Sequence, residues 1–105
     1  MVTFNSNNPT SCGIVEINSK GLMIDFEEKP IIAKSNIANG AIYYFDFKFL
    51  DYLDELNSKY QIKDFSKDVI PLLKNKIQTW HTKDYIIDIG SPSQLFDAQT
   101  KNFIN

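Results

Sequence analysis

Residues 14–27, with the sequence IVEINSKGLMIDFE, predict a β-hairpin. Residues 14–17 and 22–27 are rich in branched and aromatic side chains, and the four residues between them have turn chemistry, with Gly21 free to take a positive φ. Polar and apolar residues alternate in the second strand. We therefore expect one face toward the core (Leu22, Ile24 and Phe26) and one toward water (Met23, Asp25 and Glu27).

Other elements are predicted on both sides of the hairpin. Residues 1–11 are polar and turn-rich after a short apolar start, so they predict a loop. Residues 38–45 are apolar on both faces, which is typical of a strand in the middle of a sheet. Asp46 is placed to cap a helix whose apolar residues recur at helical spacing (Phe49, Leu50, Leu53 and Leu56).

The last third of the chain predicts two strands and two helices. A helix is expected from Ser66, shortened or bent by Pro71. Strands are expected at residues 77–82 and 85–89. A final helix begins with Ser91 as its N-cap and Pro92 at its first position, with Phe103 near its end. The order of elements predicts an α/β fold, a mixed sheet with flanking helices.

The composition of the chain argues against several functional classes of protein. The chain has 105 residues and a net charge of −2, typical of one globular domain. It contains no arginine and no lysine cluster, which argues against nucleic-acid binding. Its longest apolar run, residues 41–45, is far short of the roughly 20 residues of a membrane helix. With Cys12 as the single cysteine and no apolar signal segment, these features predict a cytoplasmic protein without membrane association.

Two acidic sites are candidates for function. Glu27, Glu28 and Lys29 follow one another at the end of a predicted strand, where open α/β sheets bind ligands; the alternative is a solvated run of charges. Asp88 lies among apolar residues of a predicted strand, and a buried carboxylate needs a hydrogen bond, a cation or a metal. The alternative for Asp88 is a hydrogen bond from the turn that follows it. His81 is predicted to have a structural role.

Five segments carry a resemblance to a known family. In chain order they are CGIVE (12–16), FEEKP (26–30), SNIANGAIY (35–43), DFSKDVIP (64–71) and IDIGSP (87–92). Together they resemble the C-terminal half of sugar-1-phosphate nucleotidyltransferases, from about residue 3 to residue 99. The similarity is greatest to bacterial guanylyltransferases that act on mannose or manno-heptose 1-phosphate. Glucose-1-phosphate thymidylyltransferases share the same pattern.

The resemblance implies a Rossmann-like catalytic domain and a set of roles. Such enzymes join a sugar 1-phosphate to a nucleoside triphosphate, release pyrophosphate and use Mg²⁺. Glu28 would hold sugar hydroxyls, and Lys29 would contact the sugar phosphate and act in catalysis. The backbone of Gly13 would lie against the sugar, and Asn39 would line the sugar pocket. Asp88 would bind Mg²⁺ as a catalytic residue.

The sequence also departs from the family. Ile86 replaces an aromatic residue, and Gly40 and Ala41 stand in the reverse of the usual order. The glycine-rich nucleotide loop and a second Mg²⁺ aspartate belong to the family's N-terminal half and have no counterpart here. We therefore expect residues 1–105 to be a single segment, the sugar-phosphate- and metal-binding half of the catalytic domain, inactive by itself.

Two other interpretations stay open. The chain could be a stand-alone, non-catalytic module for sugar-phosphate binding or assembly, or an α/β domain whose motifs are coincidental. Half of an open sheet leaves an unpaired strand edge and apolar surface. Both the enzyme half and the stand-alone module therefore predict a homo-oligomer formed through that edge or surface.

Overall fold

The predicted hairpin forms two neighbouring strands of the sheet. The computed structural model describes residues 1–101. In it β2 (Gly13–Ile17) and β3 (Met23–Glu28) pair antiparallel. The turn between them is held by Asn18, whose backbone C=O accepts the N–H of Gly21 at 3.0 Å. Gly21 has a φ of 80°, as the turn chemistry predicts.

The predicted alternation along β3 is wrong at its first residues. The register shifts between Glu16 and Ile17, so that Asp25 lies opposite Glu16 while Met23 lies opposite Ile17. Ile24 is thus an extra residue, a β-bulge, and it reverses the faces of the residues before it. As a result Met23, expected on the wet face, is fully buried.

The hairpin belongs to a five-stranded sheet of order β3-β2-β4-β1-β5. The other strands are β1 (Val2–Asn5), β4 (Ile37–Asn39) and β5 (Trp80–His81). β1 and β5 are parallel and the remaining pairs are antiparallel, so the sheet is mixed. With the helices described below, this confirms the predicted α/β fold class.

The prediction of a loop at residues 1–11 is partly wrong, because these residues contain β1 and a 3₁₀ turn, η1 (Pro9–Ser11). Thr3 pairs with Asn39 on one side and with His81 on the other. Both partners are distant in sequence, so a short strand with little alternation of its own becomes the second strand from the sheet edge.

The strand predicted at residues 38–45 is much shorter than expected. The Gly40 N–H donates to the Val2 C=O, and the Val2 N–H donates to the Ile42 C=O, both at 2.9 Å. Between these two bonds Ala41 takes a left-handed φ of 55°. The chain therefore leaves the sheet after Asn39 and continues as an extended segment to the first helix.

The first two helical segments begin within one residue of where the sequence predicts. The side chain of Asp46 accepts the N–H of Phe49 at 3.3 Å, at the start of α1 (Lys48–Tyr60). Asp64 caps the second helical segment by accepting the N–H of Lys67 at 2.9 Å. That segment consists of a π-helical turn and a 3₁₀ turn, η2 (Phe65–Val69) and η3 (Ile70–Leu73), with Pro71 at the start of the latter.

The start of the final helix is as predicted, whereas the two strands predicted before it are largely absent. α2 (Pro92–Thr100) begins at Ser91, whose hydroxyl accepts the N–H of Gln94 at 3.2 Å. The end predicted at Phe103 lies outside the described residues. The strand predicted at 77–82 is reduced to β5, and residues 85–89 form no strand.

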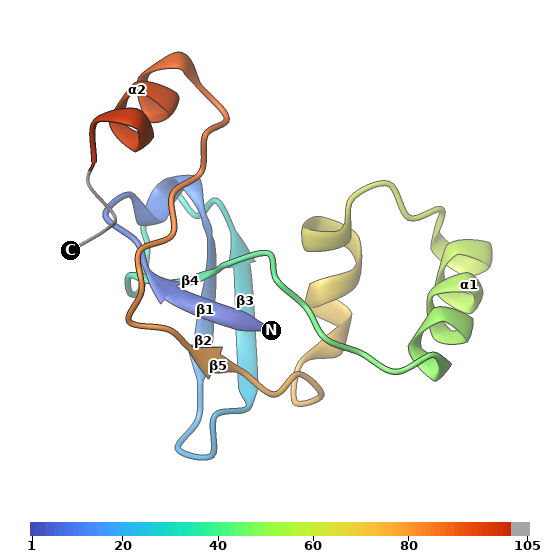
Figure 1. Ribbon diagram of the computed structural model, residues 1–105. Coiled ribbons are helices and arrows are strands. Elements are labelled where there is room, and N and C mark those ends of the chain that lie inside the picture. Colours follow the sequence, from blue (N-terminus) through green and yellow to red (C-terminus); the bar gives the residue numbers. More distant parts are fainter. Residues whose placement is uncertain (102–105) are drawn as a thin grey trace.

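The core joins the sheet to the helical segment η2–η3. One cluster comprises Val15, Met23, Phe26 and Ile70, and the other comprises Leu56, Val69 and Leu73. α1 and η2–η3 lie on one side of the sheet, while α2 lies beyond one of its ends (Figure 1). Among the described residues, no helix has the length and apolar character needed to cross a bilayer.

Candidate functional site

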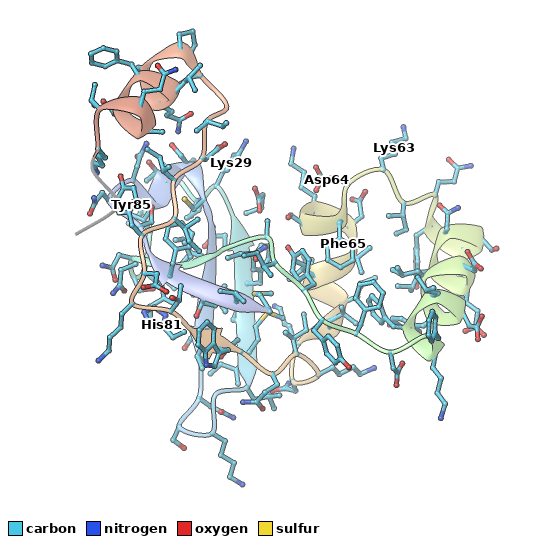
Figure 2. All side chains as sticks on the ribbon, viewed as in Figure 1. Lys29, Lys63, Asp64, Phe65, His81 and Tyr85 are labelled. Carbon is cyan, nitrogen blue, oxygen red and sulfur yellow. The ribbon has the colours of Figure 1, made fainter. Side chains whose placement is uncertain are left out.

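The five predicted site residues line one cleft of about 400 Å³ at an end of the sheet. Gly13 begins β2, Glu28 ends β3 and Asn39 ends β4. Since β2 is antiparallel to both neighbours, these three positions meet at the same end of the sheet. Lys29 follows β3 directly, and Figure 2 shows it at the sheet end nearer α2. Asp88 comes from the coil that leads from β5 to α2.

Gly13 is required by the packing around it. It is buried and pairs with Glu28. A Cβ at this position would lie 2.5 Å from Cζ of Phe26 and 2.9 Å from Oε2 of Glu28, distances that real Cβ atoms do not show. The absence of a side chain therefore lets the Phe26 ring and the Glu28 carboxylate approach the backbone, and it leaves the cleft floor open.

Glu28 and Lys29 place opposite charges at the cleft. Partial burial raises the pKa of Glu28, and the nearby Asp64 carboxylate acts in the same direction, whereas the Lys29 and Lys67 ammonium groups oppose the rise. Lys29 has a left-handed φ of 45°, and its N–H donates to the Cys12 C=O at 2.9 Å. This backbone bond fixes the chain just where the Lys29 side chain projects, because it ties the end of β3 to the start of β2.

Asn39 is held by two hydrogen bonds. Its side-chain oxygen accepts the N–H of Ala41 at 2.9 Å, which stabilises the left-handed turn there. Its side-chain nitrogen donates to the hydroxyl of Tyr43 at 2.6 Å. The ring of Tyr43 packs edge-on against Phe65, with ring centroids 4.9 Å apart. The amide of Asn39 is thus oriented from both ends at the cleft wall.

The prediction that Asp88 is a buried carboxylate in a strand is wrong. Residues 85–89 are coil, and Asp88 is exposed at the cleft. Its Oδ1 accepts the N–H of Gly90 at 3.0 Å. The alternative interpretation was a hydrogen bond from the turn that follows Asp88. It is correct for Oδ1, one of the two carboxylate oxygens.

Several residues of the cleft are not predicted from the sequence. Ser66 reaches it from η2, and Ile86 and Ile87 supply an apolar wall. The signal for Ser66 is the capping residue Asp64, which starts a helical turn and brings the residues after it to the sheet end. His81 lies outside the cleft, and its Nδ1 is 3.0 Å from the Thr3 hydroxyl, as a structural role predicts.

The cleft presents a carboxylate, an ammonium group, an amide and a second, exposed carboxylate. A carboxylate accepts hydrogen bonds from hydroxyl groups, a side-chain amide can both accept from them and donate to them, and an ammonium group attracts a phosphate. Among residues 1–101, no group of three or more His, Cys, Asp or Glu side chains is arranged to hold a metal ion. Asp88 alone offers one hard oxygen ligand, which suits an Mg²⁺ that takes its other ligands from substrate phosphates and water.

Comparison with known proteins gives relatives along the whole described chain. Residues 1–103 match the sequence profile of the nucleotidyl transferase family. Glucose-1-phosphate adenylyltransferase of Bacillus subtilis is 37% identical over 91 residues, which are 82% of this chain and 24% of that enzyme. The bifunctional protein GlmU of Methanococcus aeolicus is 32% identical over 105 residues, 95% of this chain and 25% of that protein. The chain thus spans about a quarter of the length of these curated relatives.

A solved structure shows the same fold. A glucose-1-phosphate thymidylyltransferase from Bacillus anthracis, crystallised with a sucrose, superposes with a TM-score of 0.74 at 23% identity. The superposition covers 99% of this chain and 44% of that one. The fold of residues 1–101 is therefore part of a larger fold in that structure. With a family profile that matches almost every residue, the chain belongs to the nucleotidyl transferase family.

Proposed function

We propose that the cleft binds a sugar 1-phosphate and that the chain is the sugar-phosphate side of an enzyme that makes nucleoside-diphosphate sugars. The observation that carries this proposal is that the five predicted site residues meet in one place. Gly13, Glu28, Lys29, Asn39 and Asp88 come from separate segments and line one cleft. A solvated run of charges at a strand end would need neither a glycine at position 13 nor an Asn39 side chain held by two hydrogen bonds.

The proposed roles follow from the chemistry of each group. Glu28 accepts hydrogen bonds from sugar hydroxyls, for which its carboxylate is held near Gly13. Lys29 neutralises the phosphate, and the amide of Asn39, oriented by Tyr43, contacts a further hydroxyl. Asp88 would hold Mg²⁺, which when bound offsets negative charge on transferring phosphates. In the whole enzyme the sugar phosphate attacks a nucleoside triphosphate and pyrophosphate leaves.

The identity of the sugar and the base is part of the proposal. The relatives named above are adenylyl- and thymidylyltransferases of glucose 1-phosphate, together with GlmU, and they give no specific support to the guanylyltransferase predicted from the motifs. We therefore propose glucose 1-phosphate as the first ligand to test, followed by mannose 1-phosphate. The sequence holds four separated glycines and no glycine-rich loop, so we expect no pyrophosphate release from this chain alone.

Titration of the chain with glucose 1-phosphate, with and without Mg²⁺, tests this function by calorimetry or amide chemical shifts. We expect Lys29→Ala to weaken binding about tenfold or more, since a hydrogen bond to a charged group contributes about 1.5–3 kcal/mol. Lys20→Ala, in the hairpin turn far along the sheet, is the matched control and should leave affinity unchanged. Equal affinity in both variants, or no binding of any sugar phosphate by the wild type, would contradict the proposal.

Measuring pyrophosphate release distinguishes the enzyme from the non-catalytic module. The chain alone should release none in either case. Adding the missing polypeptide should restore release only if the cleft is one side of an active site. If sugar phosphate binds and no such complex is active, the stand-alone binding module is the better description.

A further inference from the structure

The chain exposes more surface than a compact protein of its size. Its accessible surface is 7796 Å², whereas a folded monomer of 12.1 kDa is expected to expose roughly 6,000 Å². Its radius of gyration is 15.0 Å, against about 13 Å for a compact domain of this length. Within residues 1–101, fourteen large apolar side chains are exposed and nine apolar residues form the core. Much of this surface therefore has the character of an interface.

Four of the exposed large apolar side chains lie within residues 41–47, which we call the 41–47 segment and which also contains Asp46. Tyr44 is 97% exposed and Phe47 is 87% exposed, and Ile42 is exposed as well. Between them, Tyr43 and Phe45 pack on rings of the helical side, Phe65 and Phe49 respectively. Tyr43 is half-buried while Ile42 and Tyr44 on either side of it are exposed, which is the alternation of a β-strand, but Phe45 is itself 47% exposed, so the inner face is only partly covered.

The backbone of this segment is open too. Its Ile42 C=O accepts the Val2 N–H, but within the described part of the chain residues 42–45 donate no backbone hydrogen bond. Unpaired N–H groups along an extended, apolar segment are a template for pairing with a further strand. Residues 42–45 therefore have the side-chain pattern and the free donors of a strand, and lack only the neighbour.

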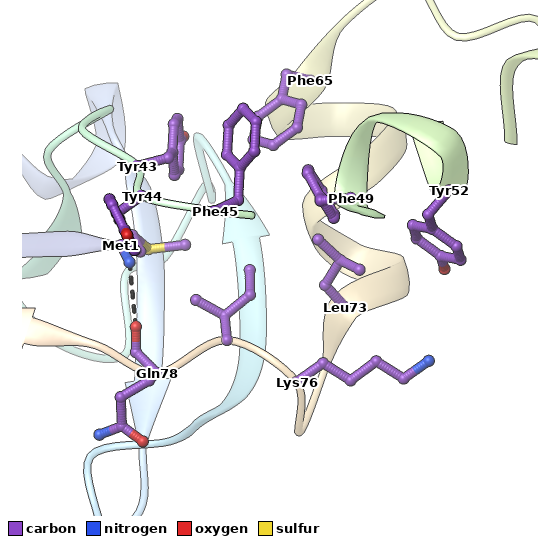
Figure 3. Close-up of a pocket in the computed structure, with 11 residues that line it drawn as sticks. Met1, Tyr43, Tyr44, Phe45, Phe49, Tyr52, Phe65, Leu73, Lys76 and Gln78 are labelled. Carbon is purple, nitrogen blue, oxygen red and sulfur yellow. Dashed lines mark hydrogen bonds between the residues drawn. The ribbon is translucent and has the colours of Figure 1, made fainter. Parts of the chain in front are cut away.

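An apolar pocket of about 430 Å³ adjoins the segment (Figure 3). It lies between the sheet, where Met1 lines it, and the helices, where Lys76 lines it. Most of its lining residues are aromatic. Its residues are Met1, Tyr43, Tyr44, Phe45, Phe49, Tyr52, Phe65, Leu73, Lys76, Ile77 and Gln78. Such a pocket fits apolar side chains that enter from a neighbouring polypeptide segment.

We propose that the 41–47 segment and this pocket are a docking surface for the part of the nucleotidyl transferase domain that this chain does not span. Residues 42–45 pair there with a strand of that part, and its apolar side chains enter the pocket. The occupant is indicated by the superposition, in which 99% of this chain matches only 44% of a larger chain. The excess over a compact protein is roughly 1,800 Å² on this chain; with an equal area on the partner, the total of roughly 3,600 Å² would be within the range that obligate partners bury.

Co-expression tests the docking surface. The probe is the Bacillus subtilis glucose-1-phosphate adenylyltransferase without the 91 residues that match this chain. We expect a 1:1 complex, with the amides of residues 42–45 protected from hydrogen exchange only in the complex. Tyr44→Asp should lower the yield of complex at least tenfold. Ile31→Asp is the matched control, because Ile31 is 96% exposed and lies outside both the segment and the pocket, and it should have no effect.

A single-chain chimera removes the need for the probe to fold alone. Residues 1–105 replace the matched 91 residues of the Bacillus subtilis enzyme, and Tyr44→Asp should lower the Tm of the chimera but not that of the isolated chain. Equal effects in both, or none in either, would overturn the proposal. So would a homodimer of the isolated chain that Tyr44→Asp abolishes, because it would assign the surface to a second copy. Lys29→Ala should leave docking unchanged, which separates this test from that of ligand binding.

Discussion

The β2–β3 hairpin and the 41–47 segment are both rich in apolar residues, yet only the hairpin forms paired strands. In the hairpin, a four-residue turn brings the partner strand into register, so pairing needs no other part of the chain. In the 41–47 segment, the left-handed Ala41 directs the chain away from the sheet, and no second strand lies beside it among the described residues. The comparison teaches that an apolar run forms a strand only where its neighbours are supplied.

The largest effect is expected inside the hairpin. Met23→Ala should lower the free energy of unfolding by about 2–5 kcal/mol, because it removes a fully buried side chain from the cluster of Val15, Phe26 and Ile70. Ile24→Ala, at the bulge and only partly buried, should cost less than half as much. Urea unfolding measures both. The reverse ranking would mean that simple alternation holds and that the bulge is absent.

A smaller effect is expected where the hairpin meets the cleft. Gly13→Ala places a Cβ 2.5 Å from the buried ring of Phe26, and the resulting overpacking should cost about 1–3 kcal/mol. Gly90→Ala is the control, since its Cβ would contact only the movable Asp88 side chain, at 3.2 Å. Its free energy of unfolding should change by less than about 0.5 kcal/mol. Equal losses in thermal unfolding would contradict this account of Gly13.

An ion pair on the hairpin's outer edge should give a weak pH dependence. The Lys74 ammonium, 2.6 Å from Asp25, holds the pKa of Asp25 below its ordinary value, and the N–H of Phe26 adds to this. A carboxyl with a lowered pKa stabilises the folded state above its unfolded pKa and loses that contribution as the pH falls through the folded one. Because both side chains are well exposed, screening limits the contribution to about 0.2–1 kcal/mol.

Lys74→Met tests this pair. It should destabilise the protein slightly at pH 7, and its difference from the wild type should fade as the pH falls below about 4. Unfolding at pH 7 and at successively lower pH, at constant ionic strength, measures it. A difference that is constant with pH would show that Lys74 acts through the packing of its aliphatic stem.

The smallest effect is expected in the 41–47 segment of the isolated chain. Ile42→Ser changes a side chain that is 56% exposed, so the free energy of unfolding should change by less than about 0.5 kcal/mol. The same substitution at Ile14, buried in β2, should cost far more. A large loss at Ile42 would mean that the segment is already covered in the isolated chain.

Elements with local signals could be predicted from the sequence, and elements that depend on distant partners could not. The hairpin, the capped start of α1 and the Ser91 cap of α2 each depend on residues a few positions apart. β1 depends on pairing with β4 and β5, which no local pattern reveals. Residues 85–89 have the composition of a strand but no neighbour in the described sheet.

The sequence predicts some of the residues that line the cleft, but not Ser66, Ile86 or Ile87 and not the local geometry. The five predicted residues follow from the resemblance to a family, and the end of the sheet where they meet follows from the antiparallel order. The sequence predicts a buried Asp88 because residues 85–89 have the composition of a strand, whereas the structure has an exposed coil there. No sequence pattern predicts the contact between Asn39 and Tyr43, because it depends on the left-handed turn at Ala41.

That contact joins two parts of the molecule. Tyr43 lines the apolar pocket, and its hydroxyl accepts a hydrogen bond from Asn39 in the cleft. A shift of the Tyr43 ring as the pocket fills would change the orientation of the Asn39 amide. Thermodynamic linkage makes such an effect reciprocal, so a partner that alters the affinity of the cleft is itself bound more or less tightly, by the same factor, when the cleft is filled. If the pocket takes a partner and the cleft takes a ligand, as proposed, this one phenol hydroxyl would couple the two binding equilibria.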